Sequence, residues 1–282
     1  MYKLPTKAIV MDAGFASRFL PITKTIPKAM IPLGNKPVMQ VVIEECARAG
    51  IAEIILVATP EGKPVYEDYF FNDPTHIKDL LARQDKSDRF EPIQHVLTGL
   101  PKITVIVQDP SLPYGNGSPI ATARPYISDD ETFVALYSDD IVVGGEGAVK
   151  ALVDTFAQHP DADAIIAVQA VEGQEIEKYG SVKFKDGTQE VERLIEKPKM
   201  AEAPSQLASY GRYLFTPEVF KYLNNDEIGK DQELWTADAV DKIAGSGKKV
   251  LVAEAENGTW YTTGDPVNYL NAQIKYSEEN NK

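Results

Sequence analysis

The sequence lacks paired cysteines and long hydrophobic runs, and each absence excludes a class of protein. Its one cysteine, Cys46, permits no internal disulfide, which is typical of proteins in a reducing cytoplasm. No apolar run approaches the roughly 20 residues that span a bilayer. The first residues also lack the charged-then-apolar pattern of a signal peptide. We therefore expect a cytoplasmic protein with no membrane partner.

Basic residues are scarce relative to acidic ones. The 282-residue chain has 29 Lys and Arg residues against 42 Asp and Glu residues, a formal net charge of −13 at pH 7. Because nucleic-acid binders usually present a basic face, we expect no nucleic-acid partner. An acidic chain can still bind phosphate groups if it concentrates a few cations or recruits a divalent metal. Individual, well-placed lysines and arginines are therefore the candidates for a ligand site.

The chain alternates strand-like and helix-like segments over its first two-thirds. A strand, a long connection, a helix and a second strand follow one another over residues 7–58, a unit typical of a parallel sheet. Strands are predicted at residues 7–11, 53–58, 103–107, 132–137 and 164–171, with a helix at 38–49 and another beginning near 118.

From residue 180 onward the pattern is less regular. Short strands are predicted at 181–184, 208–215 and 249–253 around a helix at 232–243, and a final helix at 266–276 precedes polar residues expected to fray. Residues 60–100 carry helical patches at 65–71 and 77–83, which we interpret as an elaboration over one edge of the sheet. The sequence predicts an α/β fold, a doubly wound, mostly parallel sheet with a smaller β-rich lobe.

Residues 12–32 read Asp-Ala-Gly-Phe-Ala-Ser-Arg-Phe-Leu-Pro-Ile-Thr-Lys-Thr-Ile-Pro-Lys-Ala-Met-Ile-Pro and follow the first predicted strand. Small residues such as Ala13 and Gly14 let the backbone approach a ligand and aim N–H groups at it. Arg18 and Lys28 add two positive charges, and prolines stiffen the path between them. The pattern favours a phosphate-binding loop over a surface loop with solvated cations.

This loop resembles the signature of the sugar nucleotidyltransferases, A-G-x-G-T-R-x-x-P-x-T-x-x-x-P-K-x-x-x-P. It is particularly similar to bacterial UTP–glucose-1-phosphate uridylyltransferases, in which Phe-Leu-Pro and Pro-Lys-x-Met frame the loop. Ala16 and Ser17 replace the commonest Gly and Thr. Asp12 stands where the family has a small neutral residue, and its charge would repel a triphosphate. We therefore expect Asp12 to point away or to cap the loop.

The resemblance continues into the middle of the chain. Val107-Gln108 and the later Gly115-Asn-Gly117 resemble the segment that reads the base, where a glutamine bonds the pyrimidine edge and glycines leave room for the ring. Asp139 aligns with the metal-binding aspartate at the carboxyl end of a buried strand, and a hard carboxylate suits Mg²⁺. Asp140 follows Asp139 in the chain and is expected to point elsewhere.

Later motifs resemble the sugar side of the family's site. Tyr179-Gly180 and Glu196-Lys197-Pro198 resemble the sugar-phosphate pocket, in which Lys197 would contact the phosphate and Glu196 the hydroxyls. Gly211-Arg212-Tyr213 and Glu233 resemble the remaining sugar-side elements. The segment Trp260-Tyr-Thr-Thr-Gly-Asp-Pro266 has Thr262 where two-metal relatives carry an aspartate, so a second metal held by protein is in doubt.

The resemblance implies a fold of the nucleotide-diphospho-sugar transferase type over residues 1–282. Residues 1–172 would form the nucleotide-binding part, 173–265 the sugar-phosphate lobe and 266–282 a C-terminal helix. It also implies a homodimer or homotetramer.

The implied reaction is an in-line attack of glucose 1-phosphate on the α-phosphorus of UTP, giving UDP-glucose and pyrophosphate with Mg²⁺ as cofactor. Positioning and electrostatics would drive it, and no histidine lies in a motif, which agrees with chemistry that needs no general base. The implied catalytic residues are Arg18, Lys28 and Lys197, and the implied metal ligand is Asp139. The residues implied to bind the nucleotide are Ala13, Gly14, Gln108 and Gly115. Those implied to bind the sugar phosphate are Gly180, Glu196, Lys197, Gly211 and Glu233.

Two alternatives stay open from the sequence. One is a related nucleotidyltransferase that uses dTTP or another sugar 1-phosphate. The other is a nucleotide-sugar binding protein with impaired catalysis, which the unusual Asp12 and Thr262 favour. A dinucleotide-binding dehydrogenase is much less favoured, because Gly14 is not followed by the rest of a G-x-G-x-x-G motif.

Overall fold

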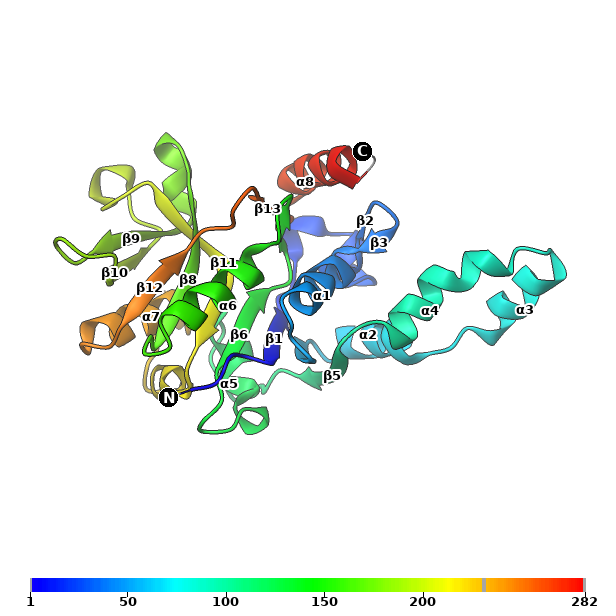
Figure 1. The fold of residues 1–282 in the computed structure, drawn as a ribbon, viewed down its shortest axis with the longest axis horizontal. Helices are drawn as coiled ribbons and strands as arrows, with labels where there is room; N and C mark the ends of the chain where they lie inside the picture. The colour runs from blue at the N-terminus through cyan, green and yellow to red at the C-terminus, as the bar shows by residue number, and fades with distance from the viewer. Residues whose placement is uncertain (1, 230–231, 281–282) are drawn as a thin grey trace.

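The computed structural model describes residues 2–229 and 232–280, and a nine-stranded sheet runs through them (Figure 1). Its main path is β10-β9-β11-β6-β1-β4-β5, with β8 paired to β11 and β12 paired to β8. The strands of this sheet are β1 (Lys7–Asp12), β4 (Glu53–Ala58), β5 (Lys102–Val107), β6 (Phe133–Tyr137), β8 (Ala164–Ala170), β9 (Gly180–Phe184), β10 (Val191–Glu196), β11 (Leu207–Phe215) and β12 (Val250–Ala253).

Two short antiparallel pairs and eight α-helices are described besides the main sheet. The pairs are β2 (Pro32–Leu33) with β3 (Lys36–Pro37), and β7 (Asp140–Val143) with β13 (Thr259–Thr262). The helices are α1 (Val38–Arg48), α2 (Gly62–Phe71), α3 (Thr75–Arg83), α4 (Glu91–Thr98), α5 (Ser118–Thr122), α6 (Ala148–Gln158), α7 (Thr236–Gly245) and α8 (Pro266–Asn280). Within the described part of the chain, no helix combines the length and apolar character needed to cross a membrane.

The N-terminal half of the sheet is parallel, and the C-terminal half is joined to it by β11. Strand β1 lies between β4 and β6, so that Val10 faces Leu56 on one side and Leu136 on the other. Strand β11 runs antiparallel to β6, β8 and β9 and therefore links the predicted nucleotide-binding part to the predicted lobe in one sheet. The α/β class with a central, mostly parallel sheet is confirmed.

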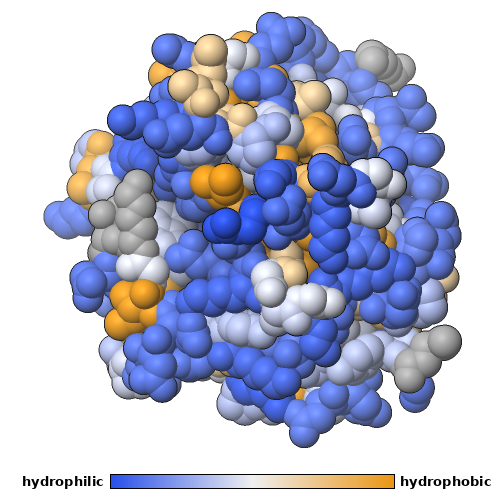
Figure 2. Space-filling model, turned by 90° about the vertical axis from the view of Figure 1, so that its left-hand side faces the viewer, coloured by the Kyte–Doolittle hydropathy of each residue, from blue (hydrophilic) through white to orange (hydrophobic). Residues whose placement is uncertain are grey.

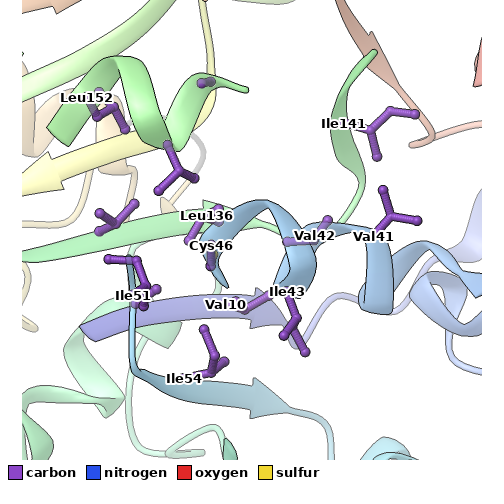
Figure 3. Close-up of a cluster of buried hydrophobic side chains, with 14 of the residues drawn as sticks. Val10, Val41, Val42, Ile43, Cys46, Ile51, Ile54, Leu136, Ile141 and Leu152 are labelled. Carbon is purple, nitrogen blue, oxygen red and sulfur yellow. The ribbon is translucent and has the colours of Figure 1, made fainter. Parts of the chain in front are cut away.

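Both faces of the sheet are covered, as a doubly wound fold requires. Along β1, Ala8 and Val10 pack into one buried cluster, whereas Ile9 and Met11 pack into the other, because successive side chains of a strand point to opposite faces. Helices α1 and α6 contribute to the first cluster, and α5 and α7 to the second. Figure 3 shows part of the first cluster, where Val42, Ile43 and Cys46 of α1 approach Val10 of β1.

Several predicted boundaries differ from the structure. The helix predicted at 232–243 is α7, which begins at Thr236, because the chain before it follows the 114–117 loop instead of turning helically. The last helix, predicted at 266–276, continues to Asn280, and residues 281–282 lie outside the described part. The elements that the sequence did not predict include strand β10 and helices α4 and α6.

Residues 60–100 form an arm beside the edge strand β5. Helix α2 packs beside β5, whereas α3 and α4 extend away from the sheet instead of covering it (Figure 1). The root of the arm is buried, since Tyr66 and Phe70 of α2 belong to the core, whereas Leu80 of α3 is half exposed. The prediction of an elaboration at one edge is confirmed, but its helices project outward from that edge.

The side of the molecule opposite the arm is strongly polar. Figure 2 shows hydrophilic residues over most of it, with hydrophobic residues in small separate groups. This distribution agrees with the acidic composition of the chain.

Candidate active site

A cavity of about 680 Å³ lies at the carboxyl ends of the central parallel strands. Open α/β sheets bind ligands at this edge. The structure places all twelve candidate residues of the sequence on its lining: Ala13, Gly14, Arg18, Lys28, Gln108, Gly115, Asp139, Gly180, Glu196, Lys197, Gly211 and Glu233. Residues from the first and the last thirds of the chain therefore meet in a single hollow.

Lys28 and Asp139 form an ion pair inside this cavity. The Lys28 ammonium donates a hydrogen bond to Asp139 Oδ2. Burial alone would raise the pKa of Asp139, but the charge and hydrogen bond of Lys28 outweigh it and hold this pKa below its usual range. Burial also works to lower the pKa of Lys28, whereas Asp139 and Asp12 raise it, and the net shift is upward. Both members of the pair therefore stay charged.

Asp12 lines the cavity, and both of its carboxylate oxygens accept hydrogen bonds. Ser138 Oγ donates at 2.6 Å to Oδ1, and the hydroxyl of the fully buried Tyr66 donates to Oδ2. Burial raises the pKa of Asp12, partly offset by Lys28 and by these two bonds. Asp12 therefore neither points away from the site nor caps the loop, but ties the end of β1 to α2 and to the segment after β6.

The backbone that carries Asp139 rests on a buried arginine. The fully buried Arg212 guanidinium donates to the carbonyls of Tyr137, at 2.9 Å, and Asp140, at 2.5 Å, on either side of Asp139. Two further bonds join Arg212 to Glu45 Oε2, at 2.9 and 3.2 Å. The interpretation of Arg212 as a sugar-side element is wrong, because it lies beneath the loop and is not on the cavity lining.

Glu45 is a structural residue that the sequence did not reveal. Besides holding Arg212, its Oε1 accepts hydrogen bonds from the N–H groups of Ala148, at 2.9 Å, and Val149, at 3.1 Å, at the start of α6. A carboxylate at a helix N-terminus is favourable because the helix dipole is positive there. The available signal was an acidic residue among the mostly apolar residues of α1.

Asp140 points away from Asp139, as expected, and is buried. Its Oδ1 accepts a bond from the Trp260 indole at 2.8 Å, and its Oδ2 accepts one from the Gly211 N–H at 2.9 Å. Burial and the neighbouring Asp139 charge raise the pKa of Asp140 to about 6. Its two bonds connect the start of β7 to β11 and β13.

Gly115 serves close packing in this structure. A Cβ atom on Gly115 would lie only 2.6 Å from the backbone nitrogen of Leu234. The Leu234 N–H donates to the carbonyl of Tyr114 at 2.8 Å, and the Gly117 N–H donates to the carbonyl of Leu234 at 2.8 Å. The glycine thus lets the 114–117 loop lie on the segment before α7, a role that the motif alone does not indicate.

An exposed aromatic pair joins the two loops of the nucleotide side. The rings of Phe15 and Tyr114 stack with centroids 6.0 Å apart and planes 14° from parallel. Phe15 is 76% exposed and Tyr114 is 55% exposed. Neither residue was predicted to belong to the site, although an aromatic residue inside a glycine-bearing loop was a usable signal.

On the sugar side, Lys197 lies against Trp235. Its ammonium is 4.3 Å from the centroid of the indole ring and 3.7 Å from Glu196 Oε1. Trp235 lines the cavity next to Glu233, and the sequence motifs did not single it out.

Thr262 faces the carboxylate of Asp139 across Gly264. A Cβ atom on Gly264 would lie 2.9 Å from Asp139 Oδ2 and 3.1 Å from Thr262 Oγ1. The next carboxylate, Asp265, accepts bonds at 3.0 Å from the N–H groups of Val267 and Asn268 and thereby caps α8. Among residues 2–229 and 232–280, no three His, Cys, Asp or Glu side chains gather into a metal-holding group.

The comparisons with known proteins agree with this geometry. The family model described as nucleotidyl transferase matches residues 7–279. A UTP–glucose-1-phosphate uridylyltransferase from Staphylococcus epidermidis is 35% identical over 274 residues, which cover 96% of this chain and 92% of the relative. A solved UDP-glucose pyrophosphorylase complexed with UDP-glucose is 28% identical with a TM-score of 0.82, covering 97% of this chain and 99% of that one.

A further solved structure, the UTP-bound UGPase from Acinetobacter baumannii, is 25% identical with a TM-score of 0.84. The match covers 98% of this chain and 94% of the chain of that structure. The chain therefore belongs to the nucleotidyl transferase family.

Proposed function

We propose that this chain transfers a uridylyl group from UTP to glucose 1-phosphate, forming UDP-glucose and releasing pyrophosphate. The observation that carries the proposal is the single cavity in which cations from two separate elements meet. Arg18 and Lys28 come from the loop after β1, and Lys197 follows β10. Two phosphorylated substrates need such an arrangement, and the names of the relatives and solved neighbours match it.

In this proposal the nucleotide occupies the side of the cavity next to β1 and β5. The small residues Ala13 and Gly14 let backbone N–H groups approach the phosphates, and Arg18 and Lys28 neutralise them. Gln108, half-buried just after β5, is placed to bond the base, beside Gly115.

The sugar phosphate occupies the side next to β9, β10 and β11. Lys197 binds the attacking phosphate, and Glu196 is placed to accept hydrogen bonds from sugar hydroxyls. The other sugar-side residues proposed are Gly180, Gly211 and Glu233.

The residues present fit Mg²⁺ as a cofactor. Mg²⁺ is usually held by one or two carboxylates together with substrate phosphates, and Asp139 offers such a carboxylate on the cavity wall. Bound there, Mg²⁺ would supply positive charge beside the phosphates. Asp139 would hold it, and Lys28, which bonds Asp139 in this structure, would serve a phosphate oxygen.

The transfer needs no proton to be removed. The phosphate of glucose 1-phosphate is already ionised at neutral pH, so its oxygen attacks the α-phosphorus directly and pyrophosphate leaves in line. In agreement, His76, His95 and His159 all lie away from the cavity lining. The protein contributes by aligning the two substrates and offsetting their mutual repulsion.

Pyrophosphate release with different substrate pairs tests the proposal. Four nucleoside triphosphates are offered with glucose 1-phosphate, and then UTP with several sugar 1-phosphates. We expect UTP with glucose 1-phosphate to give the highest kcat/KM. A higher value with dTTP or another sugar would reassign the substrates.

A second candidate is a nucleotide-sugar binding protein, which Thr262 favours because it removes one hard ligand from the site. Binding of UDP-glucose without pyrophosphate release from any pair would support this candidate and overturn the first.

A further inference from the structure

The backbone at Lys197 is held in an unusual conformation. Its φ angle is 45°, a left-handed value that non-glycine residues seldom adopt. The Lys197 N–H donates to the carbonyl of Tyr179 at 3.1 Å, which fixes the turn after β10. This conformation sends the lysine side chain over the indole ring of Trp235, with the ammonium 4.3 Å from the ring centroid.

Trp235 is held by residues on the nucleotide side of the cavity. The residue before it, Leu234, exchanges two backbone hydrogen bonds with the loop that contains Tyr114 and Gly117. The residue after it, Thr236, donates its N–H to Asn116 Oδ1 at 2.7 Å. The backbone on both sides of Trp235 is therefore held by the same loop that packs through Gly115.

We propose that Trp235 is a positioning residue that holds the Lys197 ammonium where the phosphate of the sugar substrate must bind. The inference rests on the proposed function and deepens it. The face of an indole ring attracts a cation, and tryptophan does so more strongly than other aromatic residues. Lysine has a flexible four-carbon side chain, so a ring beneath its ammonium reduces the number of positions that it visits.

Glu196 is a second group that attracts the Lys197 ammonium, so the ring is needed to hold the ammonium in place. Its carboxylate lies 3.7 Å from the same ammonium and competes for it with the incoming phosphate. Without the indole, we expect Lys197 to turn toward Glu196, which would weaken its contact with the sugar phosphate. The nucleotide side, where Lys28 and Gln108 lie, would be unaffected by loss of the ring itself.

Substitutions at Trp235 should therefore affect the KM for glucose 1-phosphate and the KM for UTP differently. We expect Trp235→Leu to raise the KM for glucose 1-phosphate about tenfold, a factor within the range of cation–π contacts, and to change the KM for UTP less than about twofold. Trp235→Phe keeps an aromatic face and should recover most of the loss. An equal rise in both KM values, or no recovery with phenylalanine, would overturn the proposal.

A double-mutant cycle with Lys197→Ala tests whether the ring acts through the lysine. Lys197→Ala should itself weaken glucose 1-phosphate far more than UTP. If Trp235 acts through Lys197, adding Trp235→Leu to Lys197→Ala should change the KM for glucose 1-phosphate less than about twofold. The same tenfold effect in both backgrounds would show that Trp235 acts independently, and would overturn the proposal.

Tryptophan emission gives a readout that does not require turnover. Glucose 1-phosphate should bring its phosphate beside the ammonium that lies over the indole and thereby change the emission of Trp235. Trp260, the other tryptophan, also lines the cavity, so its contribution is measured in Trp235→Phe. The change should disappear in Trp235→Phe and in Lys197→Ala. If wild type binds glucose 1-phosphate with this lysine-dependent change but releases no pyrophosphate, the proposed function fails and the role of Trp235 stands. No lysine-dependent change would overturn the role of Trp235 even where pyrophosphate is released.

Discussion

Lys28 and Asp139 neutralise each other inside the cavity, although one belongs to the loop after β1 and the other to the segment after β6. Each is also the group that the proposed reaction needs in another partnership, Lys28 with phosphate and Asp139 with Mg²⁺. In the absence of ligands, the ion pair therefore keeps both groups charged inside the cavity. It also means that neither charge is left without a partner in this partly buried site.

Asp139→Asn should lower turnover by about 100-fold or more, because an amide is a poor ligand for Mg²⁺. The fold should persist, since Asp12 remains to interact with Lys28. Turnover is measured at saturating substrates over a range of Mg²⁺ concentrations, and the fold by circular dichroism. Asp186→Asn, at an exposed turn position, is the control for loss of one charge. Normal Mg²⁺-dependent turnover in Asp139→Asn would exclude Asp139 as the metal ligand.

Thr262→Asp should reduce the Mg²⁺ concentration required for half-maximal activity. The hydroxyl of Thr262 and the carboxylate of Asp139 flank the same point beside Gly264, so a new carboxylate would add hard oxygen ligands there. The measurement is the Mg²⁺ dependence of both turnover and Tm, with Thr262→Asn as the neutral control. If no cation binds at this point, the added charge faces the phosphates and activity falls at every Mg²⁺ concentration. That result would mean that one metal held by Asp139 suffices.

Arg212→Met should destabilise the protein by about 3–5 kcal/mol, the range for breaking a buried ion pair, because it leaves Glu45 charged and buried without its partner. Arg193→Met removes a comparable two-bond pair with Asp241, in which the arginine side chain is 53% exposed. That exposed pair should contribute less than about 1 kcal/mol. Denaturant unfolding of both variants makes the comparison. Similar costs would show that burial does not set the strength of the Arg212 pair.

Gly115→Ala should weaken the binding of both substrates. The new Cβ would lie only 2.6 Å from the Leu234 nitrogen, so the segment that carries Trp235 must move away from the loop near Gln108. Gly187→Ala is the matched control, because Gly187 also has a positive φ, 69°, but an added methyl group there would meet no atom within 4 Å. Backbone strain alone should cost about 1–3 kcal/mol in either variant. We expect only Gly115→Ala to raise the KM for both UTP and glucose 1-phosphate.

The sequence was a good guide where local pattern decides structure. The run Glu-Ile-Ile-Leu-Val-Ala predicted β4 with its observed bounds, Glu53–Ala58, because a short apolar run between polar residues is typical of a buried parallel strand. The same reasoning placed the start of α7 four residues too early, since nothing local shows that Leu234 pairs with the 114–117 loop.

The sequence predicted which residues share the cavity, but it predicted their contacts less well. The family motifs brought Lys28, Asp139 and Lys197 to one hollow. They did not reveal that Arg212 would be buried beneath the loop, or that Trp235 would lie under Lys197. Such contacts join residues far apart in the chain, and their geometry depends on packing that periodicity and motif spacing do not record.

Tyr66 gives the projecting arm a mechanical connection to the phosphate loop. Its hydroxyl bonds Asp12 at the end of β1, and its ring is buried at the root of α2. A tilt of α2 would therefore either displace Asp12 or break that bond. Insertions and deletions near the tip of the arm should be tolerated, whereas changes near Tyr66 should affect the groups that surround Lys28.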